Sequence, residues 1–152
     1  MIRTPYLLFL GDAPDQLAAK VAQGINDWRP ENVVGQFRME GCKADVGAVD
    51  MSLEEAWDKG ARTLVIGVAN RGGVISKSWQ AVLTQALEIG YDLASGLHNL
   101  LRNEPEINAI AAREGRALHD VRVPTIAYPI ANGKKRTARQ RLPVRFFPLA
   151  IG

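Results

Sequence analysis

The sequence predicts an α/β fold, a Rossmann-like, doubly wound sheet that is mostly parallel, with about five to six strands and helices on both faces. Short apolar runs rich in β-forming residues alternate with runs at helical spacing, which is the pattern of a parallel sheet with crossover helices. The apolar runs begin near residues 4, 33, 63, 92 and 117, and these intervals match the roughly 30 residues of a βαβ unit. The chain has 152 residues, 47% of them hydrophobic, so it can bury the core of one ordinary domain.

The expected strands are the five apolar runs themselves. In chain order they span residues 6–10, 33–38, 63–69, 92–95 and 117–122. The sequence between them carries helical periodicity and helix start and stop signals. The first helix presents Leu17, Val21, Ile25 and Trp28 at spacings of four, four and three, and Pro14 suits its first turn. We expect this apolar stripe to lie on the sheet.

The remaining helices have clearer ends. Ser52 and Glu55 form a capping box before a short helix that Gly60 can end. A third helix at about residues 78–89 stops at Gly90, and its core side chains are expected to be Trp79, Val82, Leu83 and Ala86. After the fourth strand, the apolar residues Leu97, Leu100 and Leu101 precede a helix that starts at Pro105, carries Ile107 and Ile110, and stops at Gly115.

The positive charge lies at the C-terminal end of the chain. Residues 1–120 carry 12 basic and 16 acidic side chains, whereas residues 121–152 carry 7 basic and none that is acidic. We therefore expect a Rossmann-like domain over residues 1–123, a basic linker containing Pro and Gly over residues 124–141, and the start of a second domain over residues 142–152. No aromatic residue interrupts the basic run 134–141, so we favour a solvated linker over a nucleic-acid site.

Several protein classes do not fit the composition. A single cysteine, Cys42, excludes an internal disulfide framework, and no apolar run approaches the roughly 18 residues that a membrane helix needs. The N-terminus lacks the zones of a secretory signal, so we expect a cytoplasmic protein. Histidine and cysteine do not occur at paired spacings, and we expect no metal site.

Ligands of open α/β sheets bind beyond the carboxyl ends of the strands, so the loops that follow the strands are the candidate binding segments. The turn Asn70-Arg71-Gly72-Gly73 is the most informative, because adjacent glycines allow an anion to approach the backbone and Arg71 offers a planar fork for a carboxylate or phosphate. A flexible turn with a solvated arginine explains the same residues equally well. We assign all four residues to substrate binding.

The other strand ends supply further candidates. Ser95, Gly96 and His98 follow the fourth strand; His98 is the candidate acid or base, although a surface histidine is the simpler interpretation. Arg122 is a second substrate-binding candidate, whereas His119 is expected to be packed or paired and Cys42 to be inert. Candidate cofactor-binding residues are Gly11, Asp12, Lys134 and Lys135.

At these same segments the sequence resembles the N-terminal half of the bacterial DgcN-type D-glutamate (D-amino acid) N-acetyltransferase family, formerly a domain of unknown function. The stretch Gly41-Cys42-Lys43-Ala44-Asp45 is among the distinctive parts. The other matching stretches are residues 4–15, 27–31, 65–73, 94–98, 118–122 and 133–137, so the resemblance covers nearly the whole chain.

The resemblance implies a two-domain enzyme in which a P-loop-like second domain takes the phosphates of acetyl-CoA. We expect this 152-residue chain alone to be inactive, with acetyl-CoA bound mainly by that second domain, and the intact protein to be a homo-oligomer that transfers an acetyl group to a D-amino acid. From residue chemistry, Arg71 is the candidate carboxylate clamp, Asn70 and Ser95 are candidate donors, and His98 is the candidate base. The alternative is a non-catalytic domain that binds a nucleotide or metabolite or docks subunits.

Overall fold

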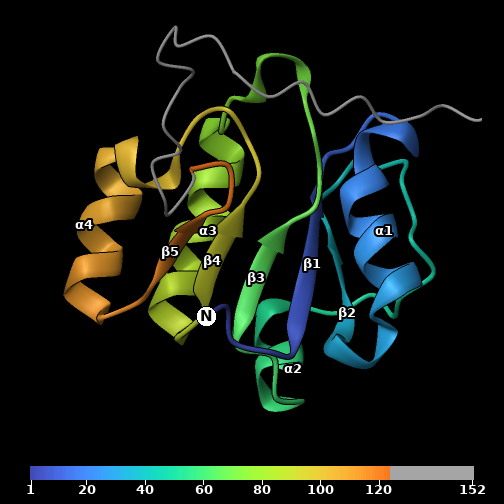
Figure 1. Cartoon of the computed structure of the whole chain (residues 1–152), viewed down its shortest axis with the longest axis horizontal. Helices are drawn as coiled ribbons and strands as arrows, with labels where there is room; N and C mark the ends of the chain where they lie inside the picture. Colours follow the sequence, from blue (N-terminus) through green and yellow to red (C-terminus); the bar gives the residue numbers. More distant parts are fainter. Residues whose placement is uncertain (124–152) are drawn as a thin grey trace, which may run out of the picture.

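The computed structural model describes residues 1–123, and these form one five-stranded sheet with every pair of neighbouring strands parallel (Figure 1). The order across the sheet is β2-β1-β3-β4-β5. The strands are β1 (Tyr6–Gly11), β2 (Val33–Arg38), β3 (Thr63–Ile66), β4 (Asp92–Ser95) and β5 (Leu118–Asp120). The predicted fold class is therefore confirmed. The expected linker 124–141 and the segment 142–152 lie outside the described residues and stay predictions.

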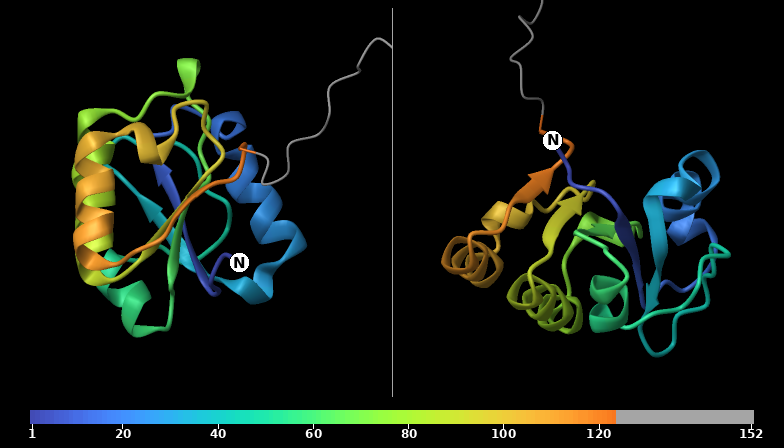
Figure 2. Two further views of the ribbon diagram at one scale, coloured as in Figure 1. Left: turned by 60° about the vertical axis from the view of Figure 1, so that its left-hand side comes forward. Right: turned by 90° about the horizontal axis from the view of Figure 1, so that it is seen from below.

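Helices cover both faces of the sheet, but unequally. Helices α2 (Leu53–Asp58), α3 (Lys77–Ile89) and α4 (Pro105–Glu114) lie on one face, and α1 (Lys20–Trp28) lies alone on the other (Figure 2). Right-handed crossovers explain this division, because the chain moves one way along the sheet from β1 to β2 and the other way from β2 through to β5. Within residues 1–123, β4 and β5 therefore have helices on one face only.

The predicted helix ends agree with the structure. The capping box before α2 is complete: the amide of Glu55 donates to the Ser52 hydroxyl at 3.1 Å, and the Glu55 carboxylate accepts from the Ser52 amide at 2.8 Å. Gly90 ends α3 with φ 131°, and Gly115 ends α4 in the left-handed region. On α3, Trp79, Leu83 and Ala86 are buried and Val82 packs against the core, as expected.

The expected orientation of the first helix is wrong. Leu17, Val21 and Trp28 are 73%, 45% and 84% exposed, and of the predicted stripe only Ile25 packs against the core. The helix approaches the sheet instead through the fully buried Ala22. The helix also begins later than Pro14 suggested, after the short 3-10 turn Leu17–Ala19.

Glycine at position 67 accounts for this orientation. A Cβ there would lie 2.4 Å from the Cβ of Ala22, so the helix backbone comes closer to the sheet than any larger pair would allow. Two backbone hydrogen bonds join the segments: the Ala22 amide donates to the Gly67 carbonyl at 3.0 Å, and the Ala69 amide donates to the Ala18 carbonyl at 2.8 Å. The segment after Ile66 bonds to the start of α1, which explains why β3 is shorter than the predicted 63–69.

The buried carboxylate of Asp92 binds the N-terminal segment through Arg3. Asp92, only 4% exposed at the start of β4, accepts from Arg3 Nε at 2.5 Å and from the Ala117 amide at 2.9 Å. Burial alone would raise the pKa of Asp92, but the bonds from Arg3 and Ala117 outweigh burial and lower the pKa below its ordinary value of 3.8. Asp92 thus links the starts of the chain, of β4 and of β5.

Replacing Gly67 by alanine tests the close approach of α1. We expect Gly67→Ala to lower the free energy of unfolding by about 1–3 kcal/mol, because the new methyl group must displace Ala22. The matched control is Gly24→Ala within α1, where a Cβ would meet nothing within 4 Å. That change should be neutral or stabilising by about 0.4–1 kcal/mol. Urea denaturation of both variants measures the difference, and equal stabilities would contradict the packing described here.

Replacing Asp92 by asparagine tests the buried carboxylate. We expect Asp92→Asn to lower the free energy of unfolding at neutral pH by about 1–3 kcal/mol. Because the pKa is lower in the folded protein, this stabilisation is complete above the ordinary pKa of 3.8 and is lost as the pH falls below it. The difference from the wild type should therefore shrink in acid. Glu88→Gln, which breaks an exposed pair with Arg113, is the control and should cost under about 0.5 kcal/mol.

Candidate functional site

The loops that follow the strands gather at one end of the molecule, at the top of Figure 1. The loops after β3 and β4 touch there. A Cβ at Gly73, after β3, would lie 2.9 Å from the backbone nitrogen of His98, after β4. The Asn99 amide also donates to the Gly73 carbonyl at 3.1 Å. Residues 70–73, which we call the glycine turn, and residues 95–98, which we call the histidine loop, are therefore neighbours. The His98 side chain is exposed.

Backbone geometry explains the two glycines of this turn. Gly72 and Gly73 have φ values of 85° and 63°, in a backbone region that residues with a Cβ rarely adopt. The Gly73 amide donates to the Asn70 carbonyl at 3.1 Å, which closes the turn Arg71–Gly73. Larger residues would strain this turn, and at Gly73 they would also collide with His98.

The two polar atoms of the Asn70 side chain differ: the nitrogen has a hydrogen-bond partner, and the oxygen has none among the described residues. Its side-chain nitrogen donates to the Val74 carbonyl at 2.6 Å, which holds the glycine turn closed. Its Oδ1 is buried and has no hydrogen-bond partner among the described residues. A buried acceptor without a partner is costly, so this oxygen is available to a ligand, whereas the side-chain nitrogen already donates within the turn.

Ser95 and Gly96 face a different surface. Ser95 is 2% exposed, and its Oγ accepts from the Leu97 amide at 3.1 Å, which leaves the hydroxyl hydrogen free to donate. Both residues line a groove on the α1 side of the sheet, whereas Asn70, Gly73 and His98 do not line it. The structure therefore places the serine beside the candidate turn, on the face that α1 partly covers.

Gly11 and Asp12, the candidate cofactor-binding residues after β1, both contact the side chain of Trp79. Gly11 has φ 55°, and a Cβ there would lie 2.8 Å from the indole of Trp79. The indole nitrogen of Trp79 donates to Asp12 Oδ1 at 2.7 Å. The ends of β1 and β3, where the strand order reverses, thus pack closely against the protein's own side chains, with Trp79 on Gly11 and Ala22 on Gly67.

The start of the first helical segment is also occupied. The Ala18 amide donates to Asp15 Oδ1 at 2.9 Å, the Ala19 amide to the Gln16 carbonyl, and the Ala22 amide to the Gly67 carbonyl. Amides at a helix start bind anions only where they lack internal partners. This helix start is therefore poorly suited to phosphate.

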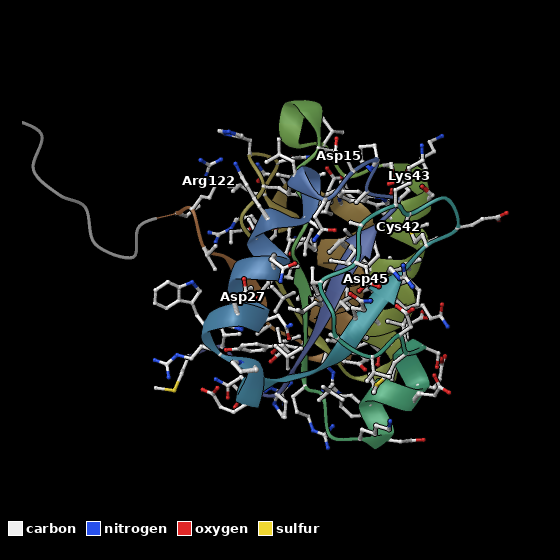
Figure 3. All side chains as sticks on the ribbon, turned by 90° about the vertical axis from the view of Figure 1, so that its right-hand side faces the viewer. Asp15, Asp27, Cys42, Lys43, Asp45 and Arg122 are labelled. Carbon is white, nitrogen blue, oxygen red and sulfur yellow. The ribbon has the colours of Figure 1, made fainter. Side chains whose placement is uncertain are left out.

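The end of β5 combines a structural carboxylate with an exposed cation. Asp120, 6% exposed, accepts from the Leu101 amide and from Arg102 Nε, both at 2.7 Å, and so fixes the loop after β4. Arg122 is exposed and lies at the carboxyl end of the sheet (Figure 3). His119 is half-buried as expected, with its Nε2 unpaired among the described residues. Lys134 and Lys135 lie outside the described residues.

The distinctive Gly41–Asp45 stretch is held by a buried glutamine that sequence reasoning missed. Gln36, 1% exposed, donates to Asp45 Oδ1 at 2.8 Å and to Asp50 Oδ1 at 3.0 Å, and it accepts from the Val46 amide. The Gly47 amide and Gln36 lower the pKa of Asp45, and the Arg38 guanidinium lowers that of Asp50. This network shapes a loop that carries Cys42 and Lys43 on the side of the molecule shown in Figure 3.

The groove on the α1 side was also missed. It has a volume of about 710 Å³ and lies between α1 and the strands β3 and β4, and we call it the α1 groove. Val21 and Trp28 form its helix side, Val65 and Ala94 its floor, and Val121 its end at β5. The sequence signal for this groove is the apolar stripe 17–28, whose spacing predicts packing in the core.

The described residues contain neither a metal-binding cluster nor a helix that could span a membrane. Across residues 1–123, no group of three or more His, Cys, Asp or Glu side chains could hold a metal ion. In the same residues, no helix has the length and apolar character needed to cross a membrane.

Curated relatives match almost the whole chain. A protein of Tritonibacter scottomollicae named D-glutamate N-acetyltransferase is 65% identical over 144 residues, which is 95% of this chain and 43% of the relative. A Pseudoalteromonas protein with the same name is 41% identical over 143 residues, covering 94% of this chain and again 43% of the relative. The chain therefore spans less than half the length of the curated relatives it matches.

Structure and family comparisons agree on the fold. A crystal structure of a DUF1611 family protein from Anabaena variabilis ATCC 29413 superposes with a TM-score of 0.68, at 23% identity over 86% of this chain and 40% of that one. A family profile, described as a Rossmann-like domain of unknown function, matches residues 37–124, more than half of the chain. The chain belongs to the Rossmann-like DUF1611_N domain family.

Proposed function

We propose that this chain is the N-terminal domain of an acetyl-CoA-dependent D-amino acid N-acetyltransferase, that D-glutamate is an acceptor, and that the domain helps to bind the amino acid. The observation that carries the proposal is the 65% identity over 144 residues with a protein named D-glutamate N-acetyltransferase. Since the chain spans 43% of that relative, the activity belongs to a longer protein, of which this domain supplies part of the site.

The glycine turn after β3 is the proposed amino acid site. An acidic amino acid presents two carboxylates and an ammonium group, so its site needs cations and an acceptor. Arg71 in the turn is the proposed carboxylate clamp, and Arg122, exposed after β5, is a second cation at the same end of the sheet. The buried Oδ1 of Asn70, which has no partner among the described residues, is the proposed acceptor for the ammonium group.

His98 is the proposed base. An amine attacks a thioester only after its ammonium form has lost a proton, and an imidazole beside the amino acid site can accept that proton. The backbone contact between His98 and Gly73 supports this role, because it brings the histidine loop against the substrate turn. Ser95 stays a candidate donor at the end of β4, on the α1 side of the sheet, where its Oγ accepts from the Leu97 amide.

The loop after β1 and the start of the first helix are poorly suited to the pyrophosphate of a coenzyme A. Such a group needs several free amides and a cation, but Gly11 packs on Trp79, Asp12 accepts from it, and the first helix start is bonded internally. We therefore propose that acetyl-CoA is held mainly by the part of the longer protein beyond this domain, with Lys134 and Lys135 as the contribution of this chain. The proposed reaction uses no metal.

Release of free coenzyme A from acetyl-CoA, with D-glutamate as acceptor, tests this function. We expect turnover by the longer protein that contains this domain and none by the 152-residue chain alone. If the longer protein acetylates neither D-glutamate nor other D-amino acids, the proposed function is wrong. Robust turnover by the 152-residue chain would contradict the assignment of the cofactor site to the rest of the protein.

Replacing Arg71 by alanine in the longer protein tests the carboxylate clamp. We expect Arg71→Ala to raise the KM for D-glutamate by an amount equivalent to about 1.5–3 kcal/mol, since charge-assisted bonds to the substrate are lost. The KM for acetyl-CoA should change little, because the clamp does not touch the cofactor. Arg113→Ala is the control, since this exposed arginine on α4 pairs only with Glu88 and Glu114 among the described residues. An unchanged D-glutamate KM in Arg71→Ala would remove Arg71 from the site.

A further inference from the structure

His98 is exposed, but the residues on either side of it are held in place. The Leu97 amide donates to Ser95 Oγ at 3.1 Å, and Leu97 is only 5% exposed. On the other side, the Asn99 amide donates to the Gly73 carbonyl at 3.1 Å. The position of His98 relative to the glycine turn therefore depends on the hydrogen bond that the Asn99 amide makes.

The side chain of Asn99 explains what keeps this amide in place. Its Nδ2 donates to Oε1 of Glu104, the residue immediately before α4. Both residues are half-buried, and a hydrogen bond to a carboxylate is stronger than one between two neutral groups. Asn99 thus binds the glycine turn through its backbone and the start of α4 through its side chain.

Asp120 independently holds the residues that lie between Asn99 and Glu104. Its side chain is 1% exposed and accepts from the Leu101 amide and from Arg102 Nε, both at 2.7 Å. These two bonds do not involve Asn99 or Glu104. Loss of the Asn99 side chain should therefore free residue 99 and leave Leu101 bound to β5, so the loop can be perturbed at this position without unfolding the domain.

We propose that Asn99 is a positioning residue for His98. Its bond to Glu104 keeps the Asn99 amide on the Gly73 carbonyl, and that contact keeps the imidazole beside the glycine turn. The inference rests on the proposed function, in which the glycine turn binds the amino acid and His98 accepts the proton of its ammonium group. Asn99 acts on the reaction through His98, and a displacement of about 1 Å in a reacting group can cost about a hundredfold in rate.

Amide hydrogen exchange in the 152-residue chain tests the contact independently of activity. We expect Asn99→Ala to lower the protection factor of the residue 99 amide about tenfold and to leave the Leu101 amide protected. Glu104→Gln keeps an acceptor and should retain most of the wild-type protection. Asn103→Ala is the matched control, because this exposed side chain of the same segment makes none of the contacts above. Unchanged protection of residue 99 in Asn99→Ala would overturn the proposal.

Kinetics of the longer protein test the effect on His98. We expect Asn99→Ala to lower the kcat with D-glutamate about tenfold and to change the KM of either substrate little, because the base is displaced while the binding groups remain. A loss of stability alone would not produce this division between kcat and KM. Glu104→Gln should retain most of the wild-type kcat, and Asn103→Ala should leave it unchanged.

The two measurements separate this proposal from the proposed function. An unchanged kcat in Asn99→Ala, together with a lower protection factor, would show that the contact does not serve the reaction. A raised KM for D-glutamate with an unchanged kcat would assign Asn99 to substrate binding instead. If the longer protein with the wild-type sequence shows no turnover, the proposed function is wrong, and the exchange result alone decides whether Asn99 holds the histidine loop at the glycine turn.

Discussion

The contact between Ala22 and Gly67 determines how the first helix sits on the sheet, and the rest of this face follows from it. Because neither residue has a side chain larger than a methyl group, the helix backbone reaches the strand and donates the Ala22 amide to the Gly67 carbonyl. The larger side chains of the same helix, Val21 and Trp28, consequently turn away from the strands beneath the helix. They form the side of a groove over β3, β4 and β5 instead.

The same close packing limits where a ligand can bind. Open α/β sheets usually bind ligands where the strand order reverses, here between the ends of β1 and β3. In this protein Trp79 packs on Gly11 and Ala22 on Gly67 at those two strand ends. Among the described residues, Asn70 Oδ1 is a buried acceptor without a partner in the loop after β3, and His98 is exposed in the neighbouring loop after β4. This arrangement is the reason why we propose an amino acid site at these loops and assign acetyl-CoA mainly to another part of a longer protein.

Local sequence signals predicted the elements well, and contacts between distant residues limited the rest. Strand spacing predicted all five strands, and the Ser52–Glu55 box predicted the start of α2, because both depend on neighbouring residues. Helical spacing identified the apolar stripe of α1 but could not show which side of the helix meets the sheet, since alanine and glycine contribute almost nothing to a hydropathy pattern. Parallel strands placed the 70–73 and 95–98 loops at one end, whereas the Gly73–His98 contact depends on loop shape, which sequence spacing does not determine.

Amide hydrogen exchange at Ala22 and Ala69 tests most directly whether the α1 contact fixes this face. Both amides donate across the contact, to the carbonyls of Gly67 and Ala18, although one lies in the first turn of a helix and the other beyond the end of a strand. Amides in such positions exchange readily unless a tertiary contact holds them. Our account predicts that both are protected to about the level of the Leu64 amide in β3. Exchange of either amide near the rate of an unfolded chain would contradict it.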